Sequence, residues 1–122
     1  ELVLPGDVVL EVGCHEGLTT SLLAARCRAQ DGDQKAAGWV LGVDRSTAAV
    51  AAARRRFPDL RFVALDVPRE LHTVLPELLP SGRQLSVAFL DLGGDARLSA
   101  VLQALVALES LPSLRLLVTK SR

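Results

Sequence analysis

The stretch VVLEVGCHEGLTT at residues 8–20 decides the fold of this chain. It joins an apolar run, a short loop bounded by Gly13 and Gly17, and the first residues of a helical pattern. Such a pattern indicates a buried strand, a tight turn and a helix, with Glu11 near the end of the strand. In a unit of this kind, backbone N–H groups point to one place beyond the sheet, where a nucleotide-like ligand can bind.

The same alternation continues along the whole chain. Five apolar runs are rich in Val and Leu without polar alternation, which is typical of strands buried on both faces of a parallel sheet. They are residues 8–12, 39–43, 61–65, 86–90 and 114–119. Helical patterns separate them at 18–29, 47–57 and 95–110, with Ser46 and Asp95 as expected N-caps. Strands that alternate with helices predict right-handed βαβ units and helices on both faces of the sheet.

Two helical segments carry more specific expectations. Helical spacing places Leu18, Leu22, Ala25 and Ala29 on one face of the first helix. In the segment 68–79, Pro76 should break a single helix, so we expect a short helix or two turns there.

Length, charge and cysteines exclude several classes of protein. A chain of 122 residues suits one domain, and a net charge of zero gives no general attraction to nucleic acid or anionic lipid. Cys14 and Cys27 have no metal-ligand spacing and are not expected to form a disulfide, which suits an intracellular protein. No apolar run is long enough to span a membrane. The chain begins with Glu1 rather than Met, so the natural N-terminus is expected to lie further upstream.

Carboxylates stand at the predicted strand ends. They are Glu11, Asp44, Asp66 and Asp91. Because the carboxyl ends of parallel strands meet at one edge of the sheet, we expect these side chains to converge. Asp44 could accept hydrogen bonds from both hydroxyls of a ribose, or it could be a helix-capping or solvated turn residue.

The loop from Gly13 to Gly17, preceded by Glu11, resembles the first motif of class I S-adenosylmethionine-dependent methyltransferases, an acidic residue followed by Gly-x-Gly-x-Gly. His15 stands where the middle glycine of that motif usually lies. The resemblance implies a Rossmann-like three-layer α/β/α fold with a parallel sheet of about five strands in the order 3-2-1-4-5. It also implies that residues 1–122 form a single S-adenosylmethionine-binding domain, expected to be part of a longer chain.

The resemblance also implies which residues hold S-adenosyl-L-methionine. Asp66 would meet the adenine amino group, although it could instead cap the turn before Pro68. The backbone N–H of Val67 would meet a ring nitrogen, and Cys14 would contribute only its backbone. Asp91 is also a weak candidate for a catalytic residue, from its position alone, and no metal site is expected. The implied cofactor-binding residues are Glu11, Gly13, Cys14, Gly17, Asp44, Asp66, Val67 and Asp91.

His15 is open to several interpretations. Its ring could fill part of the methionine pocket, stack on a substrate or point to solvent. If residue 15 needs a positive φ, histidine pays a strain that glycine would not, which would weaken cofactor binding.

Three functions are compatible with these patterns. The first is a methyltransferase of unknown substrate, with S-adenosylmethionine or S-adenosylhomocysteine as its ligand. The second is an inactive methyltransferase-like module for binding or assembly, favoured by His15 and by the absence of a substrate motif after Asp91. The third is a nicotinamide-dinucleotide oxidoreductase, whose Gly-x-Gly-x-x-Gly spacing this loop does not match. In the predicted strand order, 114–119 is an edge strand, so a partner subunit or a further part of the chain is expected to cover it.

Overall fold

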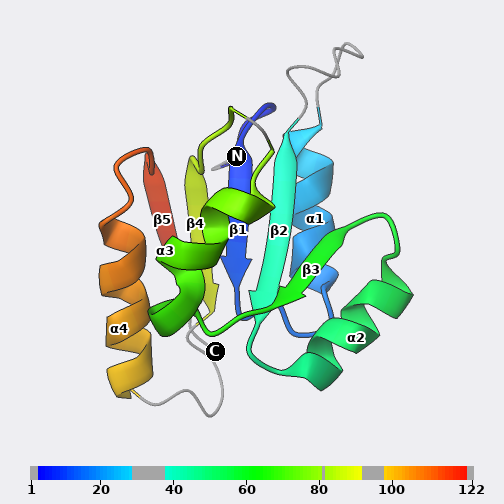
Figure 1. Ribbon diagram of the computed structural model, residues 1–122. Coiled ribbons are helices and arrows are strands. Elements are labelled where there is room, and N and C mark those ends of the chain that lie inside the picture. The colour runs from blue at the N-terminus through cyan, green and yellow to red at the C-terminus, as the bar shows by residue number, and fades with distance from the viewer. Residues whose placement is uncertain (1–2, 29–37, 81, 92–97, 121–122) are drawn as a thin grey trace.

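Strands and helices alternate along the chain in the predicted order (Figure 1). The computed structural model describes residues 3–28, 38–80, 82–91 and 98–120. Within these residues the elements are β1 (Val8–Val12), α1 (Leu18–Cys27), β2 (Trp39–Asp44), α2 (Thr47–Arg56), β3 (Arg61–Ala64), α3 (Val67–Leu78), β4 (Val87–Asp91), α4 (Leu98–Glu109) and β5 (Leu116–Lys120). The expected helix cap Asp95 lies outside the described residues.

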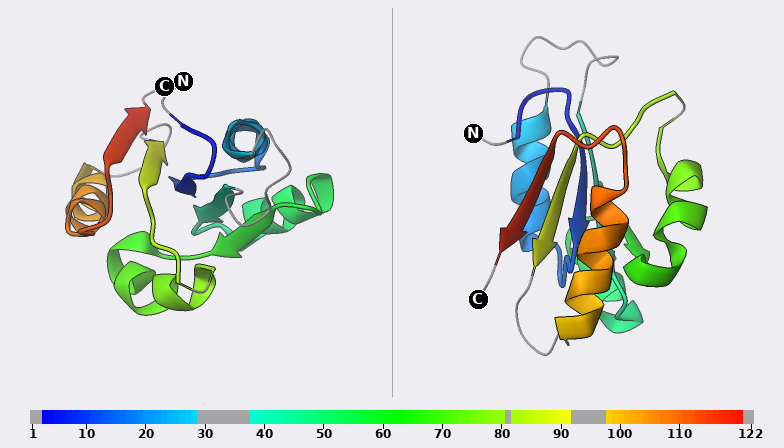
Figure 2. Two further views of the ribbon diagram at one scale, coloured as in Figure 1. Left: turned by 90° about the horizontal axis from the view of Figure 1, so that it is seen from above. Right: turned by 90° about the vertical axis from the view of Figure 1, so that its left-hand side faces the viewer.

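The strands form one parallel sheet in the order β3-β2-β1-β4-β5, which confirms the predicted order. The central strand β1 pairs with β2 on one side and with β4 on the other, so that Leu10 lies between Leu41 and Ala88. Helices α1 and α2 cover one face, and α3 and α4 cover the other (Figure 2). The architecture is therefore the predicted Rossmann-like three-layer α/β/α fold.

Alternate residues of β1 pack into two separate hydrophobic cores, one on each face of the sheet. Val8 and Leu10 pack toward α3 and α4 in the larger cluster, which includes the fully buried Leu71 and Leu108. Val9 packs on the opposite face with residues of α1. Burial on both faces explains why these strands read as continuous apolar runs rather than as alternating ones.

The buried face of α1 differs from the predicted one. Leu18 and Leu22 are 55% and 62% exposed, whereas Thr20, Leu23 and Cys27 are buried. Both sets have helical spacing, so hydrophobicity alone favoured the wrong face. Glu11 on β1 is buried and needs a hydrogen-bond donor, and Thr20 supplies it.

The expectation for the segment around Pro76 is also wrong. Helix α3 runs without a break from Val67 to Leu78 with Pro76 inside it. The proline lies in the last turn, where few helical hydrogen bonds remain to be lost, and Leu79 N–H still donates to the Leu75 carbonyl (3.1 Å). Burial of Leu71 and Leu75 against the sheet stabilises the helix across this position.

The two edges of the sheet are β3 and β5. On β3, Arg54 of α2 donates from two guanidinium nitrogens to the Phe62 carbonyl (3.0 and 2.7 Å), which occupies an acceptor near that edge. The predicted edge position of β5 is confirmed, and its covering by a further segment or subunit remains a prediction. Among the described residues, no helix has both the length and the apolar character needed to cross a membrane.

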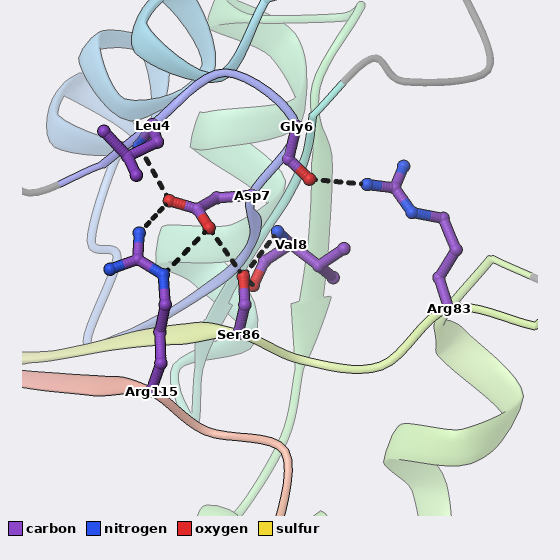
Figure 3. Close-up of polar contacts among 7 residues, drawn as sticks. All are labelled: Leu4, Gly6, Asp7, Val8, Arg83, Ser86 and Arg115. Atoms are coloured by element: carbon purple, nitrogen blue, oxygen red, sulfur yellow. Dashed lines mark hydrogen bonds and ion pairs between the residues drawn. The ribbon is translucent and has the colours of Figure 1, made fainter.

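A buried carboxylate joins the amino ends of three strands (Figure 3). Asp7, just before β1, accepts hydrogen bonds from Leu4 N–H (2.7 Å), from the Ser86 hydroxyl before β4 (3.0 Å) and from the Arg115 guanidinium before β5. Burial by itself would raise the pKa of Asp7, but the hydrogen bond from Arg115, then those from Leu4 and Ser86, hold it below the ordinary value of 3.8. The ionised form of Asp7 therefore stabilises the fold.

We predict that Asp7→Asn lowers the free energy of unfolding by about 1–3 kcal/mol at neutral pH, because it removes the charged acceptor of these hydrogen bonds. Urea denaturation measures the change. The difference in free energy of unfolding between the two proteins should narrow as the pH falls from 3.8, where Asp7 of the unfolded chain becomes protonated, toward the lower pKa at which Asp7 of the folded protein does so.

The matched control is Asp59→Asn at an exposed turn position, which should change stability by no more than about 0.5 kcal/mol. Two results would contradict the stabilising role of ionised Asp7. One is an equal loss of unfolding free energy in the two variants, and the other is a difference between Asp7→Asn and the wild type that does not narrow in acid.

Candidate functional site

The loop between β1 and α1 is held in an unusual backbone conformation. Gly13, His15 and Gly17 have positive φ values of 83°, 50° and 90°. The N–H groups of Gly13 and Cys14 both donate to the Val43 carbonyl at the end of β2 (2.8 and 3.0 Å). The loop therefore folds closely over the carboxyl end of β2.

Glycine is required at both ends of this loop for steric reasons. A Cβ atom on Gly17 would lie 2.6 Å from Cζ of Phe62, and one on Gly13 would lie 3.2 Å from Cβ of Asp91. Sequence reasoning missed a third glycine, Gly42 of β2, whose Cβ would lie 2.9 to 3.0 Å from Phe62, Cys14 and Thr20. The isolated glycine inside an apolar strand pattern was the available signal for this close approach.

Glu11 is buried, and its carboxylate contacts α1. It is 5% exposed, and its carboxylate accepts a hydrogen bond from the Thr20 hydroxyl of α1 (2.5 Å). This contact fixes the first turn of α1 against β1. A direct contact between Glu11 and a cofactor stays a prediction.

Asp44 shapes the loops at the end of β2. Its Oδ2 accepts a hydrogen bond from His15 N–H (3.1 Å) and its Oδ1 accepts one from Ser46 N–H (2.9 Å). Ser46 in turn caps α2, accepting a hydrogen bond from Ala49 N–H (3.1 Å), as its position predicted. A carboxylate has about four lone-pair sites, so Asp44 keeps capacity for the hydroxyls of a ligand.

The structure brings Asp44 and Asp91 together around His15. The ring Nε2 lies 3.4 Å from Asp91 Oδ2, and Nδ1 lies 3.9 Å from Asp44 Oδ2. The His15 side chain is 51% exposed, whereas those of Asp44 and Asp91 are 12% and 10% exposed. Sequence reasoning predicted that these two carboxylates would converge, but not that the imidazole would lie between them.

Asp66 and Val67 stand at the start of α3. Asp66 N–H donates to Glu70 Oε1 (3.1 Å), and Asp66 Oδ2 lies 4.0 Å from Arg69 Nε, so these contacts stay within the first turn of the helix. Val67 is buried in the larger core cluster. Their adenine-binding role stays a prediction.

An open cavity of about 850 Å³ lies beside the loop. Its walls are residues 13–16, the first turn of α1, the alanine face of α2, Arg56 and Asp91. Of the predicted site residues, Gly13, Cys14 and Asp91 line it, whereas Glu11, Gly17, Asp44, Asp66 and Val67 do not. The cavity therefore adjoins Asp91 and His15 on the side of α1 and α2.

The Cys14 thiol is unsuited to nucleophilic chemistry. Burial raises its pKa to about 12, and the nearby charges of Asp44 and Glu11 act in the same direction. Cys14 and Cys27 are both free and buried, as expected for unpaired cysteines. In the described part of the chain, no group of three or more His, Cys, Asp or Glu residues could hold a metal ion.

Comparison with known proteins gives a short sequence match. No family model matches the chain. It is 32% identical over 71 residues to trans-aconitate 2-methyltransferase from Acidovorax sp. strain JS42 and, to the same extent, from Acidovorax ebreus strain TPSY. The match covers 58% of this chain and 24% of each relative, so the matched residues span about a quarter of the length of these proteins.

Solved structures resemble the chain over most of its length. A candidate rRNA methylase from Clostridium thermocellum has a TM-score of 0.64 at 19% identity and covers 89% of this chain and 55% of its own. A TehB-like S-adenosylmethionine-dependent methyltransferase from Corynebacterium glutamicum has a TM-score of 0.60 at 18% identity, with 90% and 51% covered. A candidate zinc-dependent alcohol dehydrogenase from Rhodobacter sphaeroides has a TM-score of 0.63 at 16% identity, with 95% and 42% covered.

These likenesses establish the fold. The chain has the Rossmann-like sheet found in S-adenosylmethionine-dependent methyltransferases, as the resemblance of residues 11–17 implied. The dehydrogenase shares the same architecture, so the choice between cofactors depends on the site and not on the sheet.

We predict that Gly17→Ala lowers the free energy of unfolding by about 2–5 kcal/mol, the sum of left-handed backbone strain and overpacking against Phe62. Gly82→Ala is the matched control, because Gly82 has a φ of 74° but no atom within 4 Å of an added Cβ. It should cost only about 1–2 kcal/mol. Equal losses in chemical denaturation would mean that the packing of Gly17 on Phe62 is unimportant.

Proposed function

We propose that this chain is the cofactor-binding domain of an S-adenosylmethionine-dependent methyltransferase. The observation that carries the proposal is the loop of Gly13–Gly17, held with positive φ values beside the carboxylates of Asp44 and Asp91. Its place at the centre of a sheet of order 3-2-1-4-5 is where ligands bind in open α/β folds.

The residues present fit this cofactor. Glycine at positions 13 and 17 lets the backbone pass close to a ligand, and Asp44 is ionisable, nearly buried and still able to accept hydrogen bonds from ribose hydroxyls. Asp66 and Val67 begin α3 at the carboxyl end of β3, where they would meet the adenine. Cys14 would contribute its backbone, and Glu11 would hold the loop and α1 in place through Thr20.

The protein's contribution to methyl transfer would be mainly orientation and electrostatics. When bound, S-adenosylmethionine supplies an electrophilic methyl group on a sulfonium. Asp91 lines the cavity and lies beside the loop, so it is the candidate to accept a proton from the methyl acceptor. The names of the similar proteins indicate different methyl acceptors, and the proposal is therefore confined to the methyl donor.

Neither alternative function gains support from the site. A nicotinamide-dinucleotide oxidoreductase would need a different glycine spacing after β1. An inactive module would be indicated only by failure to bind the cofactor or to transfer its methyl group. Calorimetric titration with S-adenosylhomocysteine and with NAD therefore tests the proposal. Binding of NAD alone, or of neither ligand, would overturn it.

We predict that Asp44→Ala weakens binding of S-adenosylhomocysteine by about 1.5–3 kcal/mol, the range for hydrogen bonds to a charged group. Because Asp44 also holds the N–H groups of His15 and Ser46, Asp44→Asn should be measured beside it as the variant that keeps the shape. Exposed Asp59→Ala is the control and should bind like the wild type. Unchanged affinity in both Asp44 variants would mean that the ribose is held elsewhere.

A further inference from the structure

The His15 ring occupies the gap between two nearly buried carboxylates. Asp44 ends β2 and Asp91 ends β4, the strands that flank β1 on either side. Nε2 of His15 faces Asp91 Oδ2 at 3.4 Å, and Nδ1 faces Asp44 Oδ2 at 3.9 Å. A ligand that used either of these carboxylate oxygens from this gap would meet the imidazole first.

The backbone places the ring there at some cost. His15 is the single non-glycine residue with positive φ in the described part of the chain. Left-handed backbone is unfavourable for most side chains, and the loop accepts it because His15 N–H donates to Asp44 Oδ2 (3.1 Å). This hydrogen bond therefore holds the loop backbone in the conformation from which the His15 side chain projects.

The His15 ring is held only weakly by its surroundings. It is 51% exposed, and its two polar contacts are longer than well-formed hydrogen bonds. Rotation of the side chain toward solvent would open the gap without disturbing the packed core.

The geometry points to His15 as an internal competitor that sets the affinity for any ligand that enters the gap between Asp44 and Asp91. The identity of that ligand rests on the proposed function, which makes it S-adenosylmethionine or its demethylated product. Binding then includes displacement of the imidazole, and the observed affinity is lower than that of the open site by the cost of this step.

The test uses two substitutions of His15 and a matched control. Asn is too short to lie between both carboxylates but tolerates positive φ, and Gly removes the side chain altogether. The control is His72→Asn, which changes an exposed histidine on α3 whose ring contacts Ser110 (3.0 Å). Thermal unfolding without ligand checks that all four proteins, the wild type included, fold.

Calorimetry with S-adenosylhomocysteine should show about two- to tenfold tighter binding to His15→Asn and His15→Gly, the equivalent of one weak polar interaction removed. His72→Asn should bind like the wild type. In the wild type, NMR signals of the His15 ring should shift on addition of the ligand, whereas those of His72 should not.

The possible failures are distinguishable. If the wild type and both His15 variants bind S-adenosylhomocysteine with equal affinity, or the variants bind it more weakly, the competitor role is overturned and the proposed function stands. Higher thermal stability of the variants without tighter binding also overturns it, because the substitution would then relieve only backbone strain. If none of the four proteins binds the ligand, both proposals fall.

Discussion

Four backbone N–H groups converge on the carboxyl end of β2, and the arrangement of the site depends on this convergence. The Val43 carbonyl accepts hydrogen bonds from Gly13 and Cys14, and the Asp44 carboxylate accepts them from His15 and Ser46. The loops that follow β1 and β2 are therefore fixed to each other. Since these loops lead into α1 and α2, the same contacts set where both helices begin on their face of the sheet.

Two polar clusters lie at opposite ends of the strands, one at the edge where the strands begin and one at the edge where they end. At the amino edge, Asp7 joins the beginnings of β1, β4 and β5 through Ser86 and Arg115. At the carboxyl edge, Asp44 and Asp91 lie on either side of His15. Between these clusters the strands contribute apolar side chains to the two cores. The carboxyl edge, where His15 has a positive φ, is thus where the described part of this fold carries backbone strain, and it is where we propose that the ligand binds.

The strands and the glycine loop could be predicted because apolar runs and glycines are local signals, whereas the strand order was implied only by the resemblance of residues 11–17 to the methyltransferase motif. The structure departs from prediction where tertiary contacts decide. Helix α1 buries its Thr20 face rather than the more apolar face of Leu18, because buried Glu11 accepts a hydrogen bond from Thr20. Packing of α3 on the sheet outweighed the helix-breaking tendency of Pro76. Asp7 gave no signal, because its partner Arg115 is far away in sequence. The backbone of His15 is held by a hydrogen bond to Asp44 that no sequence pattern reveals.

In the proposed site Asp44 would have two roles, and these would link the stability of the loops to ligand binding. The carboxylate that would accept ribose hydroxyls already organises the backbone of both loops. A ligand that binds only the organised loops stabilises them by mass action, and any change that loosens the loops weakens binding even when the contacts to the ligand are intact. Substitutions at Ser46 or Gly13 can therefore change affinity without touching the ligand. Affinity in the proposed site would therefore depend on the order of the loops as much as on the number of hydrogen-bond donors and acceptors.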